Sequence, residues 1–176
     1  MENRLISTSK ATNQTQADLL RGFGALVSKG LDPRVAMTMT RSIGHAATAT
    51  GADVEELGRS IYSVYDNLKV PVGDVDRALE MMASAGNEGA FELRDMALYF
   101  PQLTASAAQL GVKGTKGVAS LGAALQIALK GAGDPAEAAN NLKKLSGQAV
   151  GAGNGQGLQE IWRQLQRRDE KGHRQR

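Results

Sequence analysis

Side chains that could bind a metal or act as general acids and bases are few in this chain. His45 and His173 are the only histidines, and there is no cysteine. Neither a histidine pair at helical spacing nor a thiolate site can therefore form. Asp74 and Asp76 lie two residues apart, and on a helix such side chains point in different directions. We expect a helix cap and a first-turn acid there, and we predict no catalytic residue, no metal site and no cofactor.

One glycine-rich stretch has the composition of a phosphate-binding loop. Residues 111–117 read Gly-Val-Lys-Gly-Thr-Lys-Gly and precede a predicted helix. No predicted strand leads into them, and the order Thr-Lys-Gly inverts the Gly-Lys-Ser/Thr order that brings a lysine and a hydroxyl to phosphate and magnesium. We interpret the stretch as an interhelical turn at Gly111, with anion binding as the alternative. The sequence therefore does not predict an enzyme.

Apolar residues recur at helical spacing along most of the chain. Val54, Leu57, Ile61, Val64 and Leu68, for example, share one helical face. No alternating run rich in β-branched residues lies between hairpin turns, so no strand is predicted. We expect an all-α fold, a bundle or array of about seven or eight short antiparallel helices. The predicted helices cover residues 16–29, 33–50, 53–69, 74–86, 90–110, 115–130, 134–147 and 157–171.

Turn and cap signals recur at nearly constant steps. The glycines at positions 30, 51 and 73, and again at 111 and 133, follow each other at 21 or 22 residues, which fits one helix and one short connection per step. Sequence similarity between the steps is slight, so they show a regular spacing of helices and turns and not a demonstrated sequence repeat. The turn and cap residues predicted from these signals are Asp32, Asp53, Gly73, Asp74, Gly111, Gly133 and Asp134.

Pro101 lies inside the predicted helix over residues 90–110. Proline removes one helical hydrogen bond and its ring clashes with the carbonyl four residues back, here that of Ala97. We therefore predict a kink or a break at residues 99–101, with Phe100 and Leu103 turned into the core.

Charge is distributed unevenly. The net charge is +3, but residues 161–176 contribute +4 and residues 1–160 contribute −1. A near-neutral body does not form the basic stripe of a nucleic-acid-binding domain, so we predict no specific nucleic-acid partner. The N-terminal residues lack the apolar segment of a secretion signal, and no apolar run reaches the roughly 20 residues of a membrane-spanning helix.

The composition divides the chain into four parts. We expect a flexible N-terminus over residues 1–15, a helical domain over 16–148, a glycine-rich linker over 149–157 and a basic C-terminal helix or tail over 158–176. The last part carries a narrow apolar stripe that predicts self-association, docking on another protein or folding back on the body, with a frayed terminus as the alternative. The stripe consists of Leu158, Ile161, Trp162 and Leu165.

The segment 90–145 carries a family resemblance. It reads as three helices with turns at residues 111–114 and 131–135. Its motifs, in chain order, are Asp95-Met96-Ala97 running into Pro101, Ala108-Gln109-Leu110-Gly111, a small-residue helix over 121–129, Gly131-Ala132-Gly133 and Glu137-Ala138-Ala139. Their order and spacing resemble the core region of phage tail tape measure proteins of the minor-tail type. Residues 51–70 are similar to the family as well, so the resemblance covers residues 18–147.

The resemblance implies a structural protein of phage tail assembly. Tape measure proteins occupy the lumen of the growing tail, their length fixes tail length, tube subunits polymerise around them, and they are expelled ahead of the DNA at infection. The implied partners are the tail tube protein, tail assembly chaperones and baseplate proteins, together with further copies of the chain in a homo-oligomer. The implied location is the virion tail, and the host cytoplasm during assembly.

Two expectations follow from the family's usual features. Members are much longer than 176 residues and usually include coiled-coil and apolar segments, so we interpret this chain as a fragment or a shortened prophage relative. The alternative is a free-standing helical interaction or adaptor module of prophage origin. The small-residue helix over 115–130 is a candidate for membrane contact at ejection, with the tightly packed centre of a soluble bundle as the favoured interpretation.

Overall fold

The structure is a computed structural model that describes residues 2–151, and over this range it is helical with no strand. This confirms the all-α fold. The described helices are α1 (Glu2–Thr12), α2 (Gln16–Val27), α3 (Pro33–Thr50), α4 (Val54–Asn67), α5 (Val75–Glu88), α6 (Leu93–Gln109), α7 (Gly114–Leu129) and α8 (Pro135–Gly151). A short 3₁₀ turn, η1 (Val72–Asp74), precedes α5.

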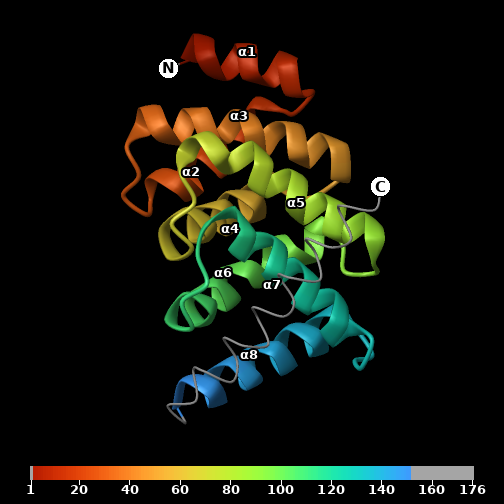
Figure 1. The fold of residues 1–176 in the computed structure, drawn as a ribbon. Helices are drawn as coiled ribbons and strands as arrows, with labels where there is room; N and C mark the ends of the chain where they lie inside the picture. Colours follow the sequence, from red (N-terminus) through yellow and green to blue (C-terminus); the bar gives the residue numbers. More distant parts are fainter. Residues whose placement is uncertain (1, 152–176) are drawn as a thin grey trace, which may run out of the picture.

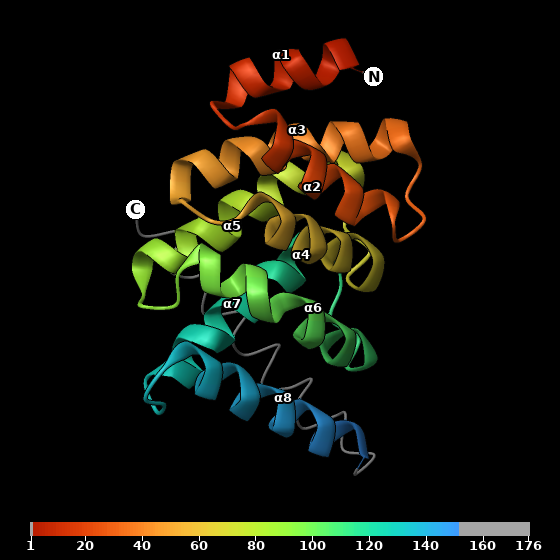
Figure 2. The same cartoon turned by 180° about the vertical axis from the view of Figure 1, so that it is seen from behind.

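The helices form two rows. The most extensive contacts join α4 to α2 and α6, α5 to α7, and α6 to α8, so a helix packs mainly on the second helix along the chain. One row therefore contains α2, α4, α6 and α8, and the other contains α1, α3, α5 and α7. Figures 1 and 2 show the resulting stack, with α1 at one end and α8 at the other. The steps of 21 or 22 residues thus each add one helix to alternate rows, while the antiparallel direction of neighbours stays a prediction.

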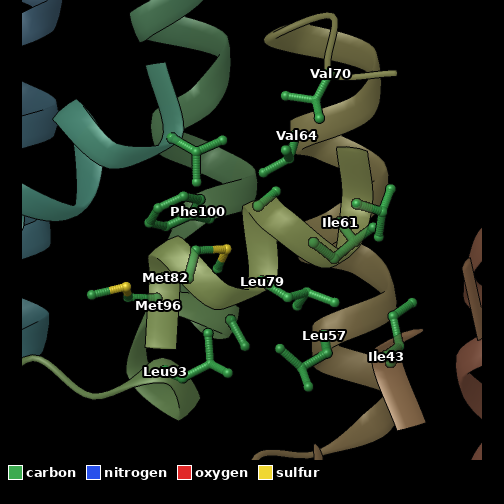
Figure 3. Close-up of a cluster of buried hydrophobic side chains, with 14 of the residues drawn as sticks. Ile43, Leu57, Ile61, Val64, Val70, Leu79, Met82, Leu93, Met96 and Phe100 are labelled. Carbon is green, nitrogen blue, oxygen red and sulfur yellow. The ribbon is translucent and has the colours of Figure 1, made fainter. Parts of the chain in front are cut away.

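Aliphatic side chains and methionines fill the space between the rows. Ile43, Leu57, Met82, Met96 and Phe100 are all fully buried or nearly so, and Figure 3 shows them converging from α3, α4, α5 and α6. Only 4% of the residues are aromatic. The stack therefore depends on close helix approach and not on large rings.

Glycines allow the closest approach, between α2 and α4. A Cβ atom on Gly58 would lie 2.9 Å from the carbonyl oxygen of Gly22 and 3.4 Å from its Cα. On Gly22, a Cβ would lie 2.7 Å from Cγ1 and 2.9 Å from the carbonyl oxygen of Val54. The two backbones are in contact at this crossing, because neither residue has a side chain to separate them.

Aspartates begin several helices by accepting backbone hydrogen bonds. The Asp32 carboxylate accepts from Arg34 N at 2.8 Å, that of Asp53 from Glu55 N at 2.9 Å, and that of Asp134 from Glu137 N at 2.8 Å. Each bond satisfies an N–H group that has no partner within its own helix.

Asp74 lies at the N-cap position of α5, as predicted, but the capping hydrogen bond expected from its side chain is absent. Asp74 has φ −102° and ψ 6°, and its side chain makes no capping hydrogen bond. The chain enters α5 through η1 instead, where Asp74 N donates to Pro71 O at 2.9 Å. This backbone differs from the extended conformation that lets a cap side chain reach the first turn. Gly73, the turn residue beside it, lies within η1 and has no positive φ.

Of the kink or break predicted at Pro101, the break does not occur, because α6 runs without interruption from Leu93 to Gln109, while the kink stays a prediction. Phe100 and Leu103 do turn into the core, with exposures of 0% and 1%. Packing against α4 and α8 holds both halves of α6 in place. Tertiary contacts therefore outweigh the lost hydrogen bond to Ala97 O.

The N-terminal segment contains a helix that the sequence analysis did not anticipate. Residues 2–12 form α1, which packs on α3. Thr8 and Thr12 are buried in this contact, and the Thr48 hydroxyl of α3 donates to Thr12 O. Gly44 allows the approach, since a Cβ there would lie 3.0 Å from Thr12 Cγ2.

Candidate interaction surfaces

The residues considered for chemistry lie apart from one another. His45 is exposed on α3, whereas Asp74 and Asp76 are exposed at the start of α5. Within residues 2–151, no group of three or more histidine, cysteine or carboxylate side chains is arranged to hold a metal. The described surface therefore offers grooves and side-chain patches as candidate sites.

The glycine-rich stretch 111–117 connects α6 to α7. Gly111 and Gly114 have φ of 81° and 66°, in the left-handed region that favours glycine. Gly114 N donates to Leu68 O at 2.6 Å, which ties the turn to the end of α4. An N–H group engaged in this way does not point at an anion, so the geometry is that of an interhelical turn.

A groove with a volume of about 590 Å³ lies between α5 and α7. Small residues make up much of its lining, and Met81, Ile127 and Leu129 provide its larger apolar side chains. Ile127 is 52% exposed although it is a large apolar residue. The groove residues are Met81, Ser84, Ala85, Gly89, Ala90, Ala119, Ala123, Gln126, Ile127, Leu129 and Lys130.

Gln126 of α7 fixes the geometry of this groove. Its Nε2 donates to Ala85 O and to Phe91 O, both at 2.9 Å, and its Oε1 accepts from Phe91 N at 3.1 Å. One amide thus satisfies three backbone groups at the end of α5 and in the connection to α6. Sequence reasoning did not find this residue, because its partners lie 35 to 41 positions away.

A charged patch covers the outer faces of α2 and α4. Arg21 pairs with Asp18, and Arg59 pairs with Glu55 and Glu56. The arginine side chains are about half exposed, so each pair contributes at most about 1 kcal/mol to stability. We interpret the patch as a solvated face whose charges compensate one another.

The other large exposed apolar residues are distributed over three helices. Leu20, Leu98, Leu145 and Val150 belong to α2, α6 and α8. Scattered apolar side chains are normal on a protein surface. Ile127 differs from these four because it belongs to the α5–α7 groove.

The small-residue helix expected over residues 115–130 corresponds to α7. Gly122 faces α5, where a Cβ would lie 3.1 Å from Ala85 Cβ, and Leu121 and Leu125 are buried. No helix in the described range is long and apolar enough to span a bilayer. Gly122 thus allows α7 to pack closely on α5, and membrane contact by this helix at ejection stays a prediction.

The sequence of the chain matches one family of known proteins. The model of the phage-related minor tail protein family matches residues 2–174. The chain belongs to this family. Over 135 residues it is 37% identical to a probable tape measure protein of Burkholderia phage BcepMu, an alignment that covers 76% of this chain and 16% of that relative. No solved structure matches the chain.

Membership of the minor tail protein family confirms the resemblance found in the motifs of residues 90–145. The aligned part is a small fraction of the BcepMu protein, so the present chain corresponds to one segment of that relative.

The predicted interaction stripe of Leu158, Ile161, Trp162 and Leu165 lies outside the described residues. Gly133, at the last predicted turn, donates its N–H to Glu137 Oε2 at 2.7 Å as α8 begins.

Proposed function

We propose that this chain is a structural segment of a phage tail tape measure protein, which sets tail length, organises polymerisation of the tail tube and is expelled at infection. The observation that carries the proposal is the family match over nearly the whole chain. The name of the BcepMu relative, a probable tape measure protein, supports the specific role.

The two-row stack is suited to a segment whose helices have to separate from one another during expulsion. Each helix contacts only near neighbours in the array, as in repeat proteins, where stability is approximately a sum of local interfaces. Pulling on one end would therefore remove one helix at a time, and the whole core would not have to break at once. This property supports the proposed expulsion along a narrow tail.

The opened and stacked states differ greatly in length. Four helices per row at about 8–10 Å spacing give a stack of roughly 30–40 Å. The same 150 or so residues as one continuous helix would reach roughly 225 Å at about 1.5 Å per residue. The length that this segment contributes to a tail thus depends on whether it remains stacked inside the tube.

The proposed partners are the tail tube protein, the tail assembly chaperones and the baseplate proteins, and further copies of the chain. Assembly would take place in the host cytoplasm, before the segment is enclosed in the tail. None of these interactions requires catalysis, and we propose that the segment has no enzymatic activity.

Mass spectrometry of purified virions tests the proposal. Peptides from this chain should be present in intact particles and depleted from particles that have released their DNA in vitro, whereas tail tube peptides should be equally abundant in both. Absence from intact particles would contradict a tail role. Genes for tube, chaperone and baseplate proteins should flank the coding region, and a host operon in their place would favour the adaptor alternative.

A further inference from the structure

We propose that the α5–α7 groove is the docking site for the chain's own C-terminal segment, with Leu158, Ile161, Trp162 and Leu165 as the side chains that enter it. These four residues have the i, i+3, i+4, i+7 spacing by which an amphipathic helix lays one face into an apolar groove. The side chains that line the groove, the reach of the chain and the distribution of charge all favour this occupant.

The groove has the surface that such a helix needs. Ala85, Ala119 and Ala123 line the groove with small side chains, which lets a helix backbone approach closely. Met81 and Ile127 provide larger apolar side chains, and methionine adapts its shape to a partner. Burying the half-exposed side chain of Ile127 would contribute favourable free energy, since apolar area removed from water stabilises a contact.

The chain is long enough to reach the groove. From Gly151, where α8 ends, to Leu158 there are seven residues, which can span at most about 25 Å. This equals the length of α8, whose 17 residues rise about 25 Å. Because α8 packs on α7 and follows directly after it, the linker can retrace α8 to the end of α7 that borders the groove.

The acidic start of α5 beside the groove is opposite in charge to the C-terminal segment, whereas the charged residue that lines the groove itself is Lys130. Residues 161–176 carry +4, whereas α5 carries Asp76, Glu80 and Glu88 against Arg77. Asp76 and Glu80 are exposed and continue the i, i+4 row of Ser84, a groove residue. Neither carboxylate has an ion-pair partner among residues 2–151. The basic residues that follow the stripe would supply those partners.

Tryptophan fluorescence of the full chain tests this directly, because Trp162 is the only tryptophan. Docking predicts a blue-shifted emission and several-fold weaker quenching by acrylamide than for a free tryptophan. Ile127→Asp should shift the emission to the red and restore quenching. Leu98→Asp is the matched control, since Leu98 is 51% exposed on α6 and is not a groove residue. It should leave the signal unchanged.

Circular dichroism checks that both variants remain helical, and if Ile127→Asp unfolds the chain, Ile127→Ser and Ala123→Ser take its place. Glu80→Lys should also increase quenching, and added salt should do the same to the parent chain. A fully quenchable Trp162 in the parent chain would overturn the proposal, as would equal responses of the Ile127 and Leu98 variants. Protection that disappears on dilution, together with a dimeric solution mass, would overturn it in favour of a second copy as the occupant.

Discussion

Replacing Gly58 with alanine tests the backbone contact between α2 and α4. The added Cβ would lie 2.9 Å from the Gly22 carbonyl oxygen and 3.4 Å from its Cα. Both are backbone atoms, so no side-chain rotation relieves the overlap and the helices must separate. Overpacking of this kind costs about 1–3 kcal/mol, while alanine regains about 1 kcal/mol of helix propensity. We expect Gly58→Ala to lower the free energy of unfolding by up to about 2 kcal/mol.

Gly24 provides the matched control. It lies on α2 two residues from Gly22, is exposed, and has no atom within 4 Å of the position of an added Cβ. Gly24→Ala should therefore raise stability by about 1 kcal/mol through helix propensity alone. The two variants should differ by about 1–3 kcal/mol, the overpacking cost alone, which corresponds to roughly 2–12 °C in Tm for a domain of this size.

Thermal and urea unfolding followed by circular dichroism measures this difference. Gly22→Ala should be destabilising as well, because it meets Val54 O at 2.9 Å. In the double variant the two costs should not add, since both substitutions force the same two helices apart. If Gly58→Ala were as stable as Gly24→Ala, α2 and α4 would not be in backbone contact, and the proposed basis of the stack would be refuted.

Four further substitutions test other parts of the fold by the same unfolding measurements. Asp53→Ala should cost about 1 kcal/mol because it removes a helix cap, whereas Asp74→Ala should be nearly neutral, and equal losses would contradict the difference seen between these two helix starts. Pro101→Ala should stabilise the chain by about 1–3 kcal/mol, because α6 is continuous and alanine restores the N–H donor to Ala97 O; a neutral or destabilising result would mean that the helix is broken there. Gln126→Leu should cost about 1–3 kcal/mol by leaving three backbone groups without their partner, and an unchanged Tm would show that the amide does not hold the groove together.

The helices that the sequence analysis located are those with local signals. Asp32, Asp53 and Asp134 act within two or three residues of their own position, so their helix starts could be predicted from composition and spacing. The first helix lacks such signals, because residues 2–12 are mostly polar and only Leu5 packs against the core. Its helical form depends on contact with α3, and this contact cannot be predicted from residues 2–12 alone.

Tertiary contacts account for the expectations that the structure corrects. The break at Pro101 was predicted from a local cost, but packing of Phe100 and Leu103 on both sides of the proline outweighs it. The two-row arrangement could not be read from the regular steps, because spacing gives the number of helices and not which of them touch. The α5–α7 groove and its Gln126 bridge are likewise products of residues far apart in sequence.

The most direct test of the proposed function is the length of tails in phage that carry altered versions of the segment. The account predicts shorter tails when codons 2–151 are deleted in frame and longer tails when they are duplicated, as measured by electron microscopy. The change should be roughly 30–40 Å if the segment stays stacked in the tube and up to roughly 225 Å if it opens into continuous helix. Tails of unaltered length in both the deletion and the duplication would contradict the account.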